Sequence, residues 1–313
     1  MSKGFDEQVM RELYLRTRNW GKWGAKDERG ALNYITPAKR LAAAALVSTG
    51  ETVSCALAFP VTPGLSNPTP AHHMMIVGGD DPCCATGPGL QTTLDYIGIA
   101  FHGLASSHID ALCHVAVDGE MYNGFPVTDV KTSGAHHNSI MNCEGGIVGR
   151  GVLLDIPALR GENWLQPSQM ITPDELQGAA EAQGVDVQEG DILLVYTGRE
   201  KRVQTLDNWD PDSVPLAGMH PLCADWLFEK RIAVLGGDGV HDPYPQLLEL
   251  PNWSMPIHQC CLVGMGVHLL DNLSLAPLAE ACRRQGRWCF QFVISPLKVA
   301  GGTGSPVNPI AIL

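Results

Sequence analysis

The stretch PLCADWLFEKRIAVLGGDG, residues 221–239, decides how this sequence should fold. Residues 222–230 predict a helix, and the apolar, β-branched run IAVLGGDG follows that helix without a linker. A helix that leads directly into a buried strand is typical of layered α/β proteins. We therefore expect a β-sheet covered by helices.

The same alternation continues on both sides of this stretch. Thr-Pro pairs at 36–37 and 172–173 predict helix starts, and Glu175 completes a capping box at the second start. A further helix is expected over residues 276–284. Short apolar runs predict strands at GVLLDI (151–156), DILLVYTG (191–198) and RWCFQFVIS (287–295).

Residues 59–89 have a different character. Pro, Gly, Asn and Asp recur there, and neither a helical nor a strand period persists. We expect a long loop packed on the body of the protein, either an active-site lid or an ordinary surface excursion. No linker is long enough to separate two units, so we expect one domain over residues 1–313.

Composition and charge favour a globular protein with a small ligand. Hydrophobic residues make up 45% of the chain and charged residues 17%, which argues against a disordered or collagen-like chain. The formal charge of -12 would repel nucleic acid and anionic lipid, although an acidic surface also simply aids solubility. Charges run through the first 20 residues and no apolar stretch of about 18 residues follows, so we expect neither a secretory signal nor a membrane span.

The cysteines predict a reducing compartment. Ten are present, with adjacent pairs at Cys83/Cys84 and Cys260/Cys261 and no CxxC spacing. A chain of this length does not need disulfides to be stable. We expect free thiols in the cytoplasm.

The strongest candidate site is FHGLASSHIDALCHV, residues 101–115. In an extended segment, His108, Asp110 and His114 would project from one face, because side chains alternate along a strand. If a helix begins there, Asp110 and His114 still share a face. Imidazole and carboxylate together suit Zn²⁺ or Mn²⁺. Local hydrogen bonds of these side chains are the alternative explanation.

Two later segments add polar side chains. In residues 255–275, His258 and Asp271 bracket an apolar run that should be buried. A buried acid needs a partner, and a metal is one; alternatively, Asp271 caps the next helix. In residues 236–245, turn chemistry alone explains Asp238, His241 and Asp242, so this segment is weak as a separate site. The chain has no GxSxG, HExxH, GxGxxG or Walker motif, which argues against serine-hydrolase, zincin and nucleotide-dependent chemistry.

Six segments together resemble the metal-dependent cyclase family, which includes bacterial kynurenine formamidase, isatin hydrolase and a dienelactone hydrolase. They are residues 20–51, 108–124, 150–156, 190–198, 235–242 and 295–313. The resemblance implies a single α/β domain with a mixed β-sheet core of the swivelling β/β/α type, flanked by helices and carrying long Pro/Gly-rich loops. It also implies a divalent metal, Zn²⁺ or Mn²⁺, and a homo-oligomer, either a dimer or a tetramer.

The resemblance assigns roles to individual residues. The family motif His-x-Gly-Thr-His-x-Asp-x-Pro-x-His supplies metal ligands from its first two histidines and its aspartate, and a proton-transferring group from its last histidine. Matched to this sequence, His108 and Asp110 are expected ligands and His114 the general acid/base. His258 and Asp271 resemble the ligands that complete the site in relatives.

The motif departs from the family pattern at its start. Leu104 occupies the position of the first histidine, Ser106-Ser107 that of Gly-Thr, and Leu112 that of the proline. His102, two residues earlier and in the same expected strand register, is one replacement for the missing ligand. A water is the other, and it would leave one metal instead of two.

The expected activity is hydrolysis of a small cyclic or acylated substrate at an amide, formamide or lactone bond. A water activated by the metal would attack, and His114 would move the proton. Trp20, Trp23, His72 and His73 are candidate substrate contacts, and an ordinary core or surface position is the alternative for each. A lactone-forming cyclase with the same site and a non-catalytic binding protein of this fold are the alternatives.

Overall fold

The computed structural model describes residues 5–81, 85–87 and 89–313, and a nine-stranded mixed sheet forms its centre. The strand order is β1-β17-β15-β9-β11-β13-β14-β6-β16. The four strands from β9 to β14 are parallel neighbours, and antiparallel pairings extend the sheet on both sides. The strands are β1 Thr52–Ser54, β6 His108–Asp110, β9 Ile147–Asp155, β11 Ile192–Tyr196, β13 Val234–Gly237, β14 His268–Asp271, β15 Cys289–Ile294, β16 Gly304–Pro306 and β17 Ile310–Ile312.

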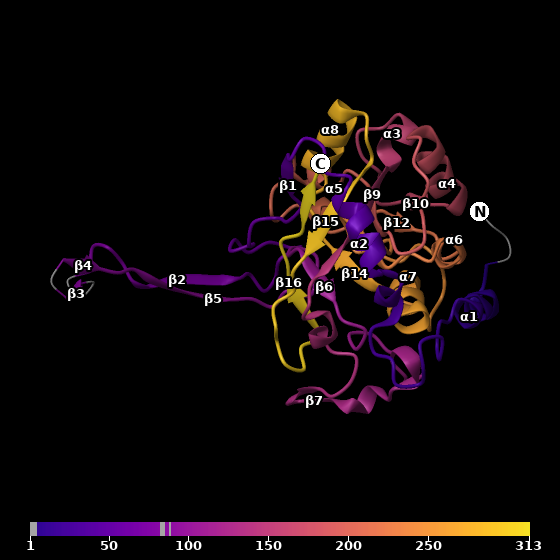
Figure 1. Ribbon diagram of the computed structural model, residues 1–313, viewed down its shortest axis with the longest axis horizontal. Coiled ribbons are helices and arrows are strands. Elements are labelled where there is room, and N and C mark those ends of the chain that lie inside the picture. Colours follow the sequence, from indigo (N-terminus) through magenta and orange to yellow (C-terminus); the bar gives the residue numbers. More distant parts are fainter. Residues whose placement is uncertain (1–4, 82–84, 88) are drawn as a thin grey trace.

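Helices surround this sheet (Figure 1), which confirms the expected α/β class. The predicted caps form, because the Thr36 and Thr172 hydroxyls accept the backbone N–H groups of Lys39 and Glu175. None of the helices in the described part of the chain is long and apolar enough to cross a membrane. The helices are α1 Glu7–Arg16, α2 Pro37–Ala44, α3 Ile156–Arg160, α4 Pro173–Ala182, α5 Arg199–Val203, α6 Cys223–Lys230, α7 Pro256–His258 and α8 Ala276–Gln285. Besides the strand pairs of the arm described below, two further short pairs of the described chain lie outside the main sheet, β7 Val130–Lys131 with β8 Gly134–Ala135 and β10 Met170–Ile171 with β12 Gly218–Met219.

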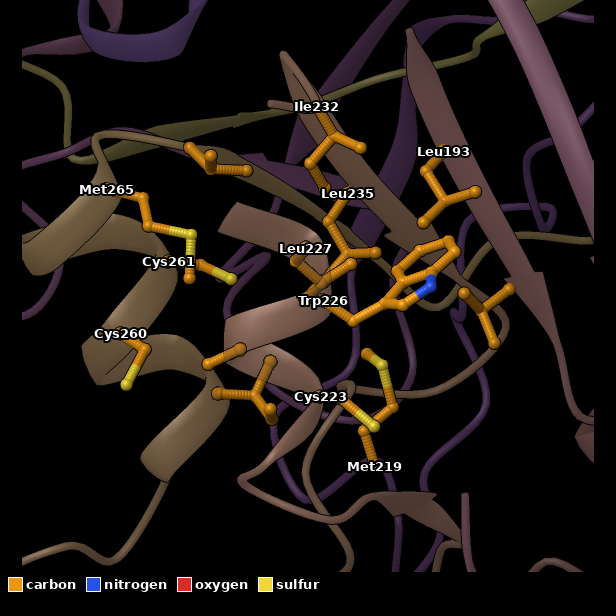
Figure 2. Packing of buried hydrophobic residues seen from close by; sticks show 14 of the residues in the cluster. Leu193, Met219, Cys223, Trp226, Leu227, Ile232, Leu235, Cys260, Cys261 and Met265 are labelled. Carbon is orange, nitrogen blue, oxygen red and sulfur yellow. The ribbon is translucent and has the colours of Figure 1, made fainter. Parts of the chain in front are cut away.

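The central strands are apolar on both faces and separate two hydrophobic cores. Leu193 of β11 packs into one core and its neighbour Leu194 into the other, because successive side chains alternate. In the first core, Trp226 from α6 lies against the sheet near Leu193 (Figure 2). The continuous apolar run DILLVYTG therefore reflects burial on both faces, as the sequence predicts.

The segment Gln259–Met265 is a buried π-helix that continues directly from α7. It ends at Gly266, whose φ of 69° places it in the left-handed region that favours glycine. The backbone of Gly30 passes so close that a Cβ there would lie 2.1 Å from the carbonyl oxygen of Gly266. These two glycines let the N-terminal segment pack against the turn that follows the buried helix.

The expectation of a loop packed on the body is wrong for much of residues 59–89. From His72 onward the chain forms a two-stranded arm, β2 His72–Val77 paired with β5 Leu94–Gly98, that projects from the body (Figure 1). Short strands β3 Ala85–Gly87 and β4 Leu90–Gln91 pair farther along it. Cys83 and Cys84 lie outside the described residues. Both faces of β2 and β5 are largely exposed, so no alternation between apolar and polar residues marks these strands in the sequence.

Gly151 provides a test of the packing between β9 and β15. It pairs with Phe290, and a Cβ added at Gly151 would lie 2.3 Å from Cε2 of that ring. We expect Gly151→Ala to lower the free energy of unfolding in urea by about 1–3 kcal/mol, the usual cost of overpacking a core. The control is Gly178→Ala in α4, where the added Cβ makes ordinary contact at 3.7 Å and raises helix propensity. Equal stabilities of both variants would contradict this description of the core.

Candidate metal centre

Two histidines and two aspartates from three elements meet at one edge of the main sheet. His108 and Asp110 lie on β6, and Asp271 is the last residue of β14. The two strands are antiparallel and place Asp271 opposite His108. His258 ends α7, just before the buried π-helix. All four side chains are buried, with no residue more than 2% exposed.

The polar atoms of this group lie close together, but they do not use up one another's hydrogen-bonding capacity. His258 Nε2 lies 3.4 Å from Asp271 Oδ2 and 3.7 Å from Asp110 Oδ2, while His108 Nε2 lies 3.5 Å from Asp110 Oδ1. Among the described residues, neither oxygen of Asp110 accepts a hydrogen bond. Ligands 2.0–2.1 Å from a tetrahedral ion lie about 3.3 Å apart, so this spacing fits a shared divalent cation.

The two histidines of this group present the ring nitrogen that a metal needs. His108 Nδ1 donates to the carbonyl of Ser106 at 2.8 Å, and His258 Nδ1 donates to Asp242 Oδ2 at 2.7 Å. Carbonyl and carboxylate oxygens only accept, so each Nδ1 carries a hydrogen. In the neutral imidazoles, the Nε2 lone pairs then face the two carboxylates, which is the usual arrangement of metal-binding histidines.

The neighbouring aspartates favour a positive charge on the two histidines of this group. Burial lowers the pKa of His108, but the nearby negative charges of Asp110 and Asp271 outweigh burial and raise it to about 9. Burial likewise lowers the pKa of His258, and Asp242 and Asp271 together raise it well above its usual value. A divalent cation would supply the charge that protons otherwise supply, because protons and metal compete for the same nitrogens.

His102 lies beside this group, although not for the reason that the sequence suggests. Its Nδ1 is 3.0 Å from Asp110 Oδ1, at an angle that makes no hydrogen bond, and its Nε2 contacts Thr303 Oγ1 at 3.1 Å. The expected strand register is wrong, because residues 99–107 form no strand. A bend of this segment brings His102 to Asp110 from outside the sheet.

His114 approaches from the open side of the group. β6 ends at Asp110, and a turn closed by the His114 N–H to the Ala111 carbonyl follows, so the segment is neither a continuous strand nor a helix. The His114 ring stacks on His102 with centroids 3.9 Å apart, and its Nε2 lies 4.0 Å from Asp110 Oδ1. The side chains of His102 and His114 are 29% and 30% exposed, so solvent reaches the group from their side. Burial lowers the pKa of His114, which favours its neutral form at pH 7.

His241 and Asp242 are site residues that the sequence analysis undervalued. His241 Nε2 makes a hydrogen bond to the Leu270 carbonyl at 3.2 Å and also lies 3.2 Å from Asp271 Oδ1. Asp242 accepts the backbone N–H groups of Ile257 and His258 as well as His258 Nδ1. Both residues lie in the turn that follows the predicted strand at β13, and this position after a strand was the available signal.

Two other expectations for this region have clear outcomes. Asp271 does not cap a helix, because α8 begins only at Ala276 with Leu275 at the cap position. Asp238 lies away from the imidazoles and accepts hydrogen bonds from Thr197 and from the backbone of Arg199. Contacts with a distant segment of the chain, and not the expected local turn chemistry, therefore account for Asp238.

A cavity of about 270 Å³ adjoins the exposed side of His102. Its lining combines apolar side chains, including Leu65, Phe101, Val214 and Tyr244, with almost as much polar surface. Pockets that bind small molecules are typically apolar with a few polar groups, and this volume is at their small end. The cavity would therefore accommodate a small molecule with both apolar and polar groups next to the histidines.

The four residues expected to contact substrate lie apart from this group. Trp20 and Trp23 are half-buried and pack against the first hydrophobic core. His72 and His73 lie on β2 in the projecting arm, where His73 pairs with Asp95 at 3.0 Å. No contact between described residues joins any of the four to Asp110, and their role in substrate binding stays a prediction.

Fold and side chains together define a class of protein, an α/β protein whose buried histidines and aspartates form a group suited to a divalent cation. The model of the Cyclase family matches residues 54–241, more than half of the chain. The chain belongs to the cyclase family, as the sequence resemblance implies.

Solved structures agree with this assignment. A structure described as a novel cyclase is 33% identical, covers 96% of this chain and 99% of its own, and superposes with a TM-score of 0.87. Isatin hydrolase A from Labrenzia aggregata is 21% identical, with coverage of 88% and 98% and a TM-score of 0.58. A predicted metal-dependent hydrolase from Bacillus stearothermophilus is 18% identical, with coverage of 83% and 97% and a TM-score of 0.50. The last two show a likeness of fold. A comparison with curated proteins found no match.

Proposed function

We propose that this chain is a metal-dependent hydrolase that cleaves an amide, formamide or lactone bond of a small cyclic or acylated substrate. The observation that carries the proposal is Asp110, a fully buried carboxylate whose two oxygens accept no hydrogen bond from the described residues. An unsatisfied buried carboxylate is costly unless a cation balances it. The neighbouring imidazoles indicate a metal of the Zn²⁺ or Mn²⁺ kind.

In this proposal the ligands come from two groups that share Asp110. Its Oδ1 faces His102 and His108, and its Oδ2 faces His258, which is also close to Asp271. A carboxylate in this position is able to bind one central ion or to bridge two. The stoichiometry of bound metal distinguishes the two arrangements.

The same geometry supports a role for His114 in proton transfer. A divalent cation bound here supplies Lewis acidity, which polarises a carbonyl and makes water a better nucleophile. The neutral His114 lies on the solvent-accessible side of the group, where it would accept a proton from water as general base. It would then return that proton to the leaving nitrogen or oxygen as general acid. The adjoining cavity would hold the substrate against this face.

The comparisons support a hydrolase, and two alternatives remain. The isatin hydrolases share the fold, and their name states hydrolysis of a small cyclic compound. A lactone-forming cyclase would use the same site in the opposite direction, and product analysis would identify it. A non-catalytic binding protein is the second alternative, favoured by Leu104 at the position of the first motif histidine.

The decisive experiment combines elemental analysis of the purified protein with a substrate panel. We expect one or two equivalents of Zn²⁺ or Mn²⁺ and turnover of at least one formanilide, cyclic imide or lactone. A chelator should abolish this turnover and added metal should restore it. A metal-free protein without chelator-sensitive turnover would instead identify a binding protein.

We further propose that the whole chain, residues 1–313, is one domain that assembles into a dimer or tetramer in the cytoplasm. The arm supports assembly, because Met74, Met75, Ile76 and Tyr96 are each more than half exposed and an isolated hairpin is only marginally stable in water. The eight described cysteines are all free, which supports a reducing compartment. Light scattering during gel filtration measures the assembly directly, and a monomer would contradict that part of the proposal.

A further inference from the structure

The segment between His102 and His108 has no regular secondary structure, yet it carries a candidate ligand at each end. Its conformation is fixed by the side chain of Asn272, the residue that follows Asp271. Asn272 Nδ2 donates to the carbonyl of Gly103 at 2.7 Å and to that of Ser106 at 3.1 Å. One amide group therefore ties the irregular segment to the end of β14.

The Ser106 carbonyl connects this contact to the candidate metal centre. The same oxygen accepts the hydrogen of His108 Nδ1 at 2.8 Å. This hydrogen bond keeps Nδ1 protonated and leaves Nε2 directed at Asp110. Asn272 thus holds the acceptor that sets the orientation of the His108 ring.

Arg199 in turn fixes the orientation of Asn272. Its Nη1 donates to Asn272 Oδ1 at 2.6 Å, and its Nη2 donates to the Leu104 carbonyl at 2.6 Å. A guanidinium only donates, so the amide oxygen of Asn272 must face Arg199 and its nitrogen must face the two carbonyls. Arg199 is 9% exposed and makes no ion pair with a carboxylate side chain of the described chain.

The backbone of Asn272 is held as firmly as its side chain. Its φ of 54° is left-handed, a conformation that asparagine tolerates better than most residues. Its N–H donates to the Gly239 carbonyl at 2.9 Å, and its own carbonyl accepts the hydroxyl of Ser107 at 2.6 Å. Because these hydrogen bonds fix the backbone of Asn272, its side chain holds the Gly103 and Ser106 carbonyls at a fixed position relative to β14.

We propose that Arg199 and Asn272 are positioning residues of the candidate metal centre. They form a chain of hydrogen bonds from Arg199 through Asn272 and Ser106 to His108, and they set the course of the segment that carries His102. This inference rests on the proposed metal site but not on the reaction that occurs there. Partners of this kind typically contribute 10–100-fold to metal affinity.

The test compares Arg199→Met with Arg202→Met. Arg202 is a matched control, because it is 8% exposed and its Nη groups also donate to two backbone carbonyls, those of Asp212 and Pro215. In competition with a chelator, we expect Arg199→Met to weaken Zn²⁺ or Mn²⁺ binding by about 10–100-fold and Arg202→Met to leave it unchanged. Arg199→Lys should have a metal affinity between those of Arg199→Met and the wild-type protein, since one ammonium group cannot replace the two Nη donors of the guanidinium group.

A second readout needs no metal. In the metal-free protein, the Nδ1 hydrogen of His108 should exchange slowly with solvent in NMR spectra, and faster in Arg199→Met and in Asn272→Asp. Asn272→Asp keeps the shape of the side chain but cannot donate a hydrogen bond to the Ser106 carbonyl. It therefore provides the same test if the Arg199 variant fails to fold. If the Nδ1 hydrogen of His108 exchanged as slowly in the folded Asn272→Asp variant as in the wild-type protein, the inference would be overturned. Equal losses of metal affinity in Arg199→Met and Arg202→Met would also overturn it. If the wild-type protein binds no metal, the proposed function fails while the exchange measurement still decides this inference.

Discussion

Replacing Asp110 by asparagine is expected to abolish metal binding and to lower turnover by on the order of 10³-fold or more. The substitution preserves volume but removes the carboxylate that is common to both groups of candidate ligands among the described residues. Without its charge, the remaining imidazoles and Asp271 offer too little negative charge and too few ligands to retain a divalent cation. The loss of turnover follows, because a metal hydrolase depends on the ion for both polarisation and nucleophile.

Thermal unfolding gives a measurement of this effect that does not require a substrate. Metal at 100 times its Kd should stabilise the wild-type protein by about 2.7 kcal/mol and leave Asp110→Asn unaffected. Asp95→Asn is the matched control, since Asp95 forms only an exposed ion pair with His73 on the arm. An Asp110→Asn protein that retains metal at the wild-type stoichiometry would show that the centre is elsewhere.

His114→Ala is expected to keep its metal while turnover falls by about 10²–10⁴-fold, the usual contribution of a general acid/base. The five candidate ligands do not include His114, whose Nε2 lies 4.0 Å from the nearest oxygen of Asp110. Elemental analysis and kcat measured on the same preparation separate the two effects. Added imidazole should recover part of the turnover, because it replaces the missing ring in the space that the substitution opens.

The control for this variant is His136→Ala, which removes an exposed imidazole that belongs to no part of the site. It should change neither metal content nor turnover. If His114→Ala lost its metal as readily as Asp110→Asn, His114 would have to be reassigned as a ligand. If it retained full turnover, proton transfer would have to be assigned to another group.

The local signals in the sequence predicted strands β9, β11, β13 and β15 and helices α2, α4, α6 and α8, for physical reasons. Strands β9, β11 and β13 are short apolar runs because they are buried on both faces, and the helices at Pro37 and Pro173 begin with a threonine that caps them. The arm went unpredicted because strands exposed on both faces carry no inside-outside pattern. Hydrophobic periodicity arises from burial of one face of an element, so it cannot reveal a strand that is exposed on both faces.

The candidate site was only partly predictable. His108 and Asp110 alternate on one strand, and family resemblance pointed to His258 and Asp271. His102 was suggested by a strand register that does not exist, and a bend in the chain brings it to Asp110 instead. Spacing along the chain describes neighbours within one element, whereas contacts between elements depend on the packing of the sheet and on the loops that connect it.

The same reason explains why His241 and Asp242 were undervalued. Each contacts a partner more than a dozen residues away, Asp271 and His258 respectively. Their segment looks like a common turn, because glycine, aspartate and proline have the same preferences in turns with and without a function. Only the pairing of β13 with β14 brings these side chains behind the candidate ligands.

The projecting arm has a consequence for how this protein can change over generations. Within the described chain, β2 and β5 pair only with each other and share no backbone hydrogen bonds with the nine-stranded sheet. Insertions, deletions and surface substitutions in the arm therefore leave the two cores and the buried carboxylates undisturbed. Changes in the arm would then alter the proposed assembly without altering the hydrogen bonds of the sheet, so contacts between copies and the candidate site are able to evolve separately.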